Sequence, residues 1–132
     1  MAESVKLEYD PDLNIVFTED HREIKTKEDV DQFFEEHIKF FEKLGKKVYM
    51  ISNIDGLLVH ATIAEYYGEI ARLTVGQYLL GFARYGTNEW ARMTVRTTSL
   101  KVRMIANIYD SREEAIQAVQ RMKEKDKMHN NK

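Results

Sequence analysis

The sequence predicts one mixed α/β domain, with a five-stranded sheet and four helices in the order β-β-α-β-α-β-α-β-α. Residues 48–54 (VYMISNI) form a nearly unbroken apolar run, which is typical of a strand covered on both faces. Amphipathic helical patterns separate this run from the later apolar runs, which indicates right-handed crossovers and locally parallel pairing. A chain of 132 residues is long enough for one hydrophobic core and too short for two ordinary domains.

Two strands are expected at the start of the chain. Residues 5–9 (VKLEY) alternate between apolar and polar side chains, and residues 13–18 form a second apolar run. The turn signal DPD at residues 10–12 lies between them. We therefore expect an antiparallel hairpin that pairs the two strands.

The first helix is expected over residues 27–44, where Thr26 caps its start and Gly45 ends it. His37 lies within the apolar stripe, where a partly buried packing role is weighed against a functional one. The stripe consists of Val30, Phe33, Phe34, His37, Ile38, Phe41 and Leu44.

A second helix, over residues 62–75, follows the central strand. Thr62 and Glu65 have the T-x-x-E spacing of a capping box, which would start this helix. One helical face gathers Ile63, Tyr67, Ile70, Ala71 and Thr74.

The next pair of elements is a strand over residues 78–85 and a helix over residues 88–98, capped by Thr87 or Asn88. The helix contains several β-branched residues, which lowers its intrinsic propensity. Its expected packing face consists of Trp90, Met93, Thr94 and Thr97.

The chain closes with a strand over residues 102–109 and a helix over residues 111–123, which Ser111 and Glu114 open as a second capping box. The inward face of that helix is Ala115, Ala118, Val119 and Met122. Residues 124–132 are highly charged and are expected to form a frayed tail. The expected core includes Phe33, Phe34, Ile51, Ile70, Phe82 and Ile105.

Composition limits the classes of protein. The chain has no cysteine, which excludes disulfides, thiolate ligands and a cysteine nucleophile, and which fits a reducing, cytoplasmic location. Neither a signal peptide nor a run of about 20 apolar residues for a membrane span is apparent. The four histidines lack metal-site spacing, and no nucleophile–base pair stands out, so neither metal, cofactor nor enzymatic activity is expected.

Charge is distributed unevenly around a net value of −2. Residues 1–71 contain 16 acidic and 8 basic residues, whereas residues 72–103 contain six basic residues and only one acid, Glu89. The overall balance argues against a general nucleic-acid binder. The basic middle third nevertheless favours an anionic partner.

A binding surface is expected at the tip that follows the central strand. The carboxyl ends of parallel strands meet at one edge of a sheet, and helix N-termini there attract anions. An acidic protein loop, a phosphate or a carboxylate would fit such a surface. The residues expected to form it are His60, Ala61, Thr62, Arg84, Tyr85 and Gly86.

Other readings of these residues remain open. Thr62 is a phosphorylation site or is explained by its capping role alone, and His60 is explained by an exposed turn. Arg92 and Arg96 lie one helical turn apart and would grip an anion together with Arg84 and Arg103, or would belong to a solvated face. The aromatic side chains of Tyr66, Tyr67, Tyr85 and Trp90 would line a pocket or belong to the core.

Short stretches of the chain resemble a known family. The hairpin, the buried strand ending in SNIDG (residues 52–56) and the following helix look like a STAS domain of the SpoIIAA-like type. The stretches FARYGTNEWARM (82–93) and NIYDSREEAIQAV (107–119) are similar to the later elements of such domains. The resemblance covers residues 5–123.

The resemblance implies a non-enzymatic bacterial domain that binds partner proteins, nucleotides or small ligands. In the anti-sigma-factor-antagonist branch, a serine at the start of the helix after the central strand is phosphorylated. The D-S-S-G-L pattern of that switch is absent here, because residues 59–62 read VHAT and Thr62 is the only hydroxyl. A SpoIIAA-like branch that shares its shape with SEC14-type lipid carriers also lacks the switch, and this chain looks closer to it.

Two functions therefore stay open. The first is a regulatory module that binds a protein partner, and a homodimer is compatible with it. The second is a carrier or sensor of a small amphipathic or anionic ligand.

Overall fold

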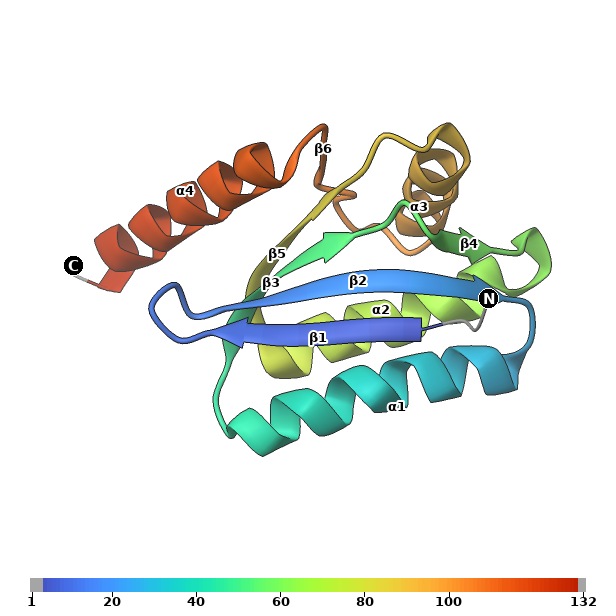
Figure 1. Ribbon diagram of the computed structural model, residues 1–132, viewed down its shortest axis with the longest axis horizontal. Coiled ribbons are helices and arrows are strands. Elements are labelled where there is room, and N and C mark those ends of the chain that lie inside the picture. The colour runs from blue at the N-terminus through green and yellow to red at the C-terminus, as the bar shows by residue number, and fades with distance from the viewer. Residues whose placement is uncertain (1–3, 131–132) are drawn as a thin grey trace.

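The computed structural model describes residues 4–130 and has the expected α/β architecture with four α-helices (Figure 1). The predicted elements occur in the predicted order, with one short strand and one 3₁₀ helix added. In chain order the elements are β1 (Ser4–Asp10), β2 (Ile15–Ile24), α1 (Lys27–Leu44), β3 (Val48–Asn53), β4 (Leu57–Val59), the 3₁₀ helix η1 (Ala61–Ile63), α2 (Ala64–Tyr78), β5 (Leu79–Tyr85), α3 (Glu89–Lys101), β6 (Ile108–Tyr109) and α4 (Arg112–Asn130).

The sheet has six strands in the part of the chain that is described, so the predicted count of five is wrong. β1 and β2 pair in antiparallel fashion, as the hairpin signal predicted. β2, β3, β5 and β6 then follow side by side, and each pair of neighbours is parallel. The additional strand β4 runs parallel to the end of β2, with Leu57 opposite Arg22.

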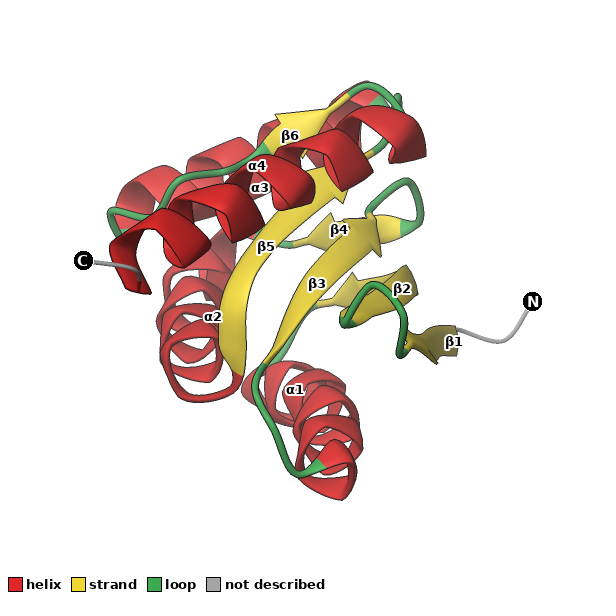
Figure 2. Cartoon of the chain, turned by 90° about the vertical axis from the view of Figure 1, so that its left-hand side faces the viewer, coloured by secondary structure: helices red, strands yellow, loops and turns green. Residues whose placement is uncertain are grey.

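Helices cover both faces of the sheet. α1 and α2 lie together on one face, and α4 lies on the other (Figures 1 and 2). Alternate residues of β3 divide between the two layers: Val48 packs in a cluster with Phe41 of α1, whereas Tyr49 and Ile51 pack with Val119 of α4. Both faces of the central strand are therefore buried, as its apolar run indicated.

Most of the expected core is confirmed. Phe33, Phe34, Ile51 and Phe82 are buried. Ile70 is only partly buried.

Ile105 was predicted to be buried and is 73% exposed. The expected strand over residues 102–109 pairs only at Ile108–Tyr109, because the backbone before it turns through left-handed conformations at Arg103 (φ 58°) and Asn107 (φ 51°). A chain with two such residues cannot stay extended against β5, so Ile105 projects into solvent.

The packing face predicted for α3 is also wrong. Trp90 is 68% exposed and Met93 is 49% exposed, whereas the buried side chains of α3 are Ala91, Val95, Thr98 and Ser99. The reason is a close approach to α2: a Cβ added at Gly68 would lie 2.8 Å from Cγ1 of Val102. Only small and β-branched side chains fit between the two helices, so the indole is turned outward.

The capping signals have mixed outcomes. Gly45 ends α1 in a left-handed conformation, and the Asn88 side chain caps α3. Ser111 accepts a hydrogen bond from the backbone N–H of Glu114, whose carboxylate accepts from Asp110 instead of from Ser111. The capping box predicted at Thr62 is absent, because Thr62 lies inside η1 and α2 begins at Ala64 without a side-chain cap.

Two threonines provide a direct test of these caps. Thr26 and Asp29 form the reciprocal capping box of α1, so Thr26→Ala should lower the free energy of unfolding by about 1 kcal/mol in urea melts. Thr62→Ala is the matched control and should change it by less than about 0.5 kcal/mol. A larger loss at Thr62 would contradict the cap assignment.

The last helix is longer than predicted. α4 continues to Asn130, so the tail expected to be frayed is helical over residues 124–130, and residues 131–132 lie outside the described residues. Its inward side chains Ala115, Ala118 and Val119 are buried as predicted, and Met122 is partly buried. None of the helices within residues 4–130 is long and apolar enough to cross a membrane.

Candidate functional site

The tip that follows the central strand is organised by Asp55. Its Oδ1 accepts hydrogen bonds from the backbone N–H groups of Thr87 (2.8 Å) and Asn88 (2.9 Å), just before α3. A Cβ at Gly86 would lie 2.6 Å from the same oxygen, so glycine permits this approach. The position where we expected an external anion at the start of α3 therefore holds the protein's own carboxylate.

Arg84 and Tyr85 were predicted to join one surface, but they lie on opposite faces of the sheet. Arg84 points beneath α2, where its Nη1 donates to the carbonyl of Ala106 (2.7 Å). Tyr85 lines a hollow on the other face with Phe17 and Arg112. Successive residues of a strand alternate between its faces, so the two side chains cannot serve one surface site.

The predicted arginine clamp is not assembled either. Nη1 of Arg92 donates to the carbonyl oxygens of Gly86 (2.7 Å) and Tyr109 (3.2 Å) and to Asp110 (3.1 Å), so it holds two loops together. Arg96, one turn later, is exposed. Arg103 lies outside the strands and is exposed, so it does not neighbour Arg84 in the sheet.

His60, Ala61 and Thr62 remain together at the surface. The Nε2 of His60 lies 2.6 Å from Oε2 of Glu23 at the end of β2, and this contact lowers the pKa of the Glu23 carboxyl. Ala61 and Thr62 are exposed in η1. The Thr62 hydroxyl does not cap a helix. The structure therefore gives Thr62 no capping role, and its phosphorylation stays a prediction.

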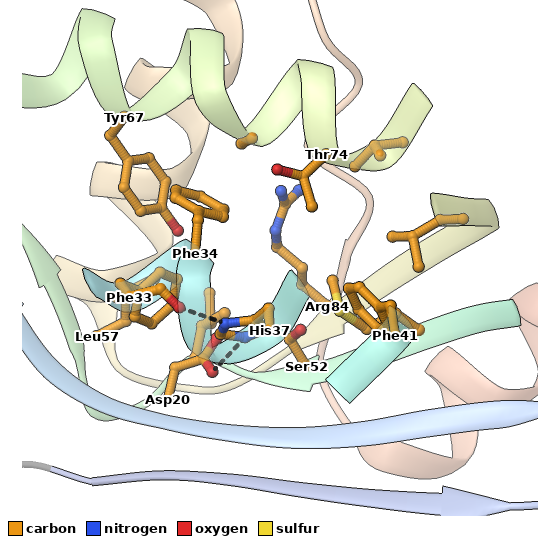
Figure 3. A pocket seen from close by; sticks show the side chains of 15 residues that line it. Asp20, Phe33, Phe34, His37, Phe41, Ser52, Leu57, Tyr67, Thr74 and Arg84 are labelled. Carbon is orange, nitrogen blue, oxygen red and sulfur yellow. Dashed lines mark hydrogen bonds and ion pairs between the residues drawn. The ribbon is translucent and has the colours of Figure 1, made fainter. Parts of the chain in front are cut away.

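Beneath α1 and α2 lies a small, largely enclosed cavity with polar side chains in its wall (Figure 3). Asp20 of β2 and His37 of α1 are both buried, with Oδ1 of Asp20 3.6 Å from Nε2 of His37. The other ring nitrogen, Nδ1, lies 2.8 Å from the carbonyl oxygen of Phe33. Tyr67 and Arg84 complete the polar lining.

The pKa of His37 is set by opposing effects. Burial by itself lowers the pKa, but the Asp20 carboxylate and the Phe33 carbonyl outweigh it and raise the pKa above its usual range. Nδ1 lies within hydrogen-bond distance of the Phe33 carbonyl, whereas Nε2 and Oδ1 of Asp20 form a longer ion pair that leaves Oδ1 without a hydrogen bond among the described residues. His37 is thus more than the partly buried packing histidine that the helical stripe suggested.

This cluster does not have the geometry of a nucleophile and its base. Ser52 lines the same cavity, but neither nitrogen of His37 is left to accept a proton from it, since one faces Phe33 and the other faces Asp20. The free space of about 40 Å³ also admits nothing larger than a few waters. Within residues 4–130 no three His, Asp or Glu side chains are grouped to hold a metal ion.

An open groove lies between β4–η1 and α3. Leu58, His60 and Ala61 line one side, and Trp90, Met93 and Thr97 line the other, around a volume of about 330 Å³. We call this feature the α3 groove. Two of the residues predicted for the binding surface, His60 and Ala61, therefore lie in its wall.

Cationic side chains border the α3 groove. Lys101 lines one end. An adjoining hollow over Trp90 and Met93 is lined by Arg96 and by Glu89, the acid that begins α3. The groove is thus apolar in its middle and carries more positive than negative charge along α3.

Neither the models of known protein families nor the curated proteins contain a match to this chain. Any functional assignment therefore depends on the chemistry of the site. The α3 groove is the best candidate, because exposed aromatic and sulfur-containing side chains gather there in a concave surface. Sequence reasoning missed Leu58. For Trp90 it left open a pocket and the core, and the indole lines the α3 groove.

Proposed function

We propose that this chain is a non-enzymatic binding module of the STAS, SpoIIAA-like type, and that it binds a partner protein in the α3 groove. The occupant that we infer is an amphipathic segment with apolar anchor side chains and acidic flanks. The observation that carries the proposal is the exposure of Trp90 (68%) and Met93 (49%) in the wall of that groove.

The apolar character of the groove supports a protein partner. A tryptophan left mostly exposed forgoes a large burial free energy, and Trp and Met are enriched in the cores of protein interfaces. Leu58 on the facing wall is also exposed, at 38%. An inserted side chain would contact both walls, and the half-open shape suits a segment laid along α3.

The positive charge along the α3 groove supports a partner segment with acidic flanks. Lys101 and Arg96 lie along the groove and its adjoining hollow, where Glu89 is the only acid among the described residues of either lining. Opposite charges on a partner would steer association and fix its orientation.

The alternative is a carrier or sensor of a small amphipathic ligand. Carriers enclose an acyl chain, whereas the largely enclosed cavity beneath α1 and α2 has only about 40 Å³ of free space. The open α3 groove, of about 330 Å³, is large enough for a short acyl chain, so the fatty acid decanoate serves as a competing ligand in the binding test.

Trp90 is the only tryptophan in the sequence, so its fluorescence reports directly on the groove. We expect a helical peptide with leucine on one face and glutamate on the other to shift the Trp90 emission to shorter wavelength. A peptide with lysine in place of glutamate should bind about 10-fold more weakly. Titration of both peptides, followed by fluorescence, measures this difference.

Substitutions in and outside the α3 groove test whether the peptide binds there. Reversing the charge at Arg96 and Lys101 together should weaken the glutamate peptide about 10-fold, whereas Arg121→Glu on α4 should leave it unchanged. Met93→Glu should abolish binding, and Leu73→Glu, which alters another exposed apolar residue, should not. An emission that neither peptide changes would refute the proposal, and a shift with decanoate alone would favour the small-ligand alternative.

A further inference from the structure

Arg84 is a partly buried cation that has no carboxylate in direct contact, although the carboxylate of Asp20 lines the same cavity. Within residues 4–130 its guanidinium forms no ion pair, and its one hydrogen bond runs to the carbonyl of Ala106. Its other contact is with the face of the Phe82 ring, 4.6 Å from the ring centroid. Burial lowers the pKa of Arg84 below the usual range of an arginine, which reflects the cost of keeping a charge there.

Unpaired hydroxyl groups share the same space. The hydroxyls of Tyr67 and Ser52 line the cavity beside Arg84, and neither has a hydrogen-bond partner among the described residues. Both residues are buried, and their side chains line the cavity. Among the described residues, the buried polar atom of this wall that has no hydrogen-bond partner is Oδ1 of Asp20. Figure 3 shows that the side chains of Tyr67, Ser52 and Arg84 come from α2, β3 and β5 and border one space beneath α2.

From this arrangement we propose that the cavity binds one small monovalent anion of the size of chloride. The anion would accept hydrogen bonds from the free N–H groups of Arg84 and from the hydroxyls of Tyr67 and Ser52. It would supply a negative charge in direct contact with the guanidinium, whereas Asp20 lines the cavity without forming an ion pair with Arg84 among the described residues.

The size of the cavity limits the ligand. About 40 Å³ of free space accommodates a monatomic anion or a few waters, and excludes a phosphate ester or an organic acid of any length. Water would satisfy the hydroxyls but would place no negative charge in contact with Arg84, so the two occupants would differ in their effect on the free energy of unfolding.

The charged groups around the cavity make binding depend on pH. Asp20 of β2 faces His37 of α1, Glu36 lies next to His37 on the same helix, and Tyr67 and Arg84 face the pair from α2 and β5. With His37 protonated, the Asp20 carboxylate is neutralised by its own partner. An anion beside Arg84 is then repelled least, so binding should be tighter near pH 6 than near pH 8.

Thermal unfolding at matched ionic strength tests the proposal, with sodium chloride compared to sodium gluconate, whose anion is too large to enter. We expect the Tm near pH 6 to be about 3 °C higher in chloride. The ³⁵Cl NMR line of chloride should also broaden in the presence of the protein. Equal Tm values in the two salts and an unbroadened line would mean that the cavity holds water only, which would overturn the proposal.

Two variants assign the effect to this cavity. Arg84→Met should remove the chloride-specific rise in Tm, whereas Arg96→Met at the exposed position should retain it. If Arg84→Met does not fold, Tyr67→Phe keeps the ring and removes only the hydroxyl, and it should reduce the ³⁵Cl broadening. Tyr66→Phe is its control, because that hydroxyl donates to Asp31 outside the cavity. Full broadening with Tyr67→Phe, or a chloride effect that survives Arg84→Met, would contradict the assigned site.

Discussion

Replacing Phe33 by alanine is expected to lower the free energy of unfolding by about 3–5 kcal/mol. Phe33 is 2% exposed and lies at the centre of an aromatic cluster between α1 and α2. Its ring centroid is 5.1 Å from that of Phe34, 4.6 Å from His37 and 5.9 Å from Tyr67. Removal of the ring leaves a cavity that these neighbours fill only in part, which adds to the lost transfer free energy.

Urea denaturation followed by circular dichroism measures this loss. Leu73→Ala is the control, because Leu73 is 63% exposed on α2 and its truncation should cost less than about 0.5 kcal/mol. A loss below about 1 kcal/mol for Phe33→Ala would contradict the packing of α1 described above.

Phe33 also illustrates what could be predicted from the sequence. The buried stripe of α1 depends only on helical periodicity, and its two ends depend on the side chain of Thr26 and the backbone of Gly45. The alternation of apolar runs and helical patterns likewise predicted locally parallel pairing, which the pairs β2–β3 and β3–β5 show. These features follow from neighbours within a few residues along the chain.

The errors involve contacts between distant segments. Trp90 was assigned to the packing face of α3 because its spacing fits a helical face, but the approach of Gly68 to Val102 determines which face of α3 is buried. No strand was predicted between residues 54 and 62, since the three residues of β4 form a strand only because they pair with the end of β2. Periodicity within a segment contains no information about such pairings.

The binding surface was predicted in part, and one of its errors was avoidable. His60 and Ala61 do lie in the wall of the α3 groove. Arg84 and Tyr85 are consecutive in a strand, so the two-residue period already placed them on opposite faces of the sheet. By contrast, the occupation of the α3 N-terminus by Asp55 depends on a contact across 32 residues and had no signal in the sequence.

The second large effect is expected at the buried pair of Asp20 and His37. Asp20→Ala should lower the free energy of unfolding by about 3 kcal/mol near pH 6, because it leaves a buried imidazolium without its carboxylate. Glu23→Ala breaks the partly exposed contact with His60 and is the matched control, with a much smaller expected loss because water screens that contact.

Asp20→Ala should also reverse the pH dependence that His37 contributes to the free energy of unfolding. In the native protein the pKa of His37 lies above the unfolded value of 6.5, so the stabilisation is complete below pH 6.5 and is lost as the pH rises through the folded pKa. Without Asp20, burial is the main remaining influence and lowers the pKa of His37 below 6.5. The variant should then lose stability as the pH falls below 6.5.

Urea melts from about pH 5.5 to 8 on both proteins give the two slopes, and their difference cancels the contributions of the other histidines. NMR titration of the His37 ring should show the same change directly, with a pKa above 6.5 in the native protein and below it in Asp20→Ala. Parallel slopes in the two proteins would mean that His37 is neutral in both. In that case Asp20 would carry the negative charge that balances Arg84, and the cavity would have no net positive charge to attract an anion.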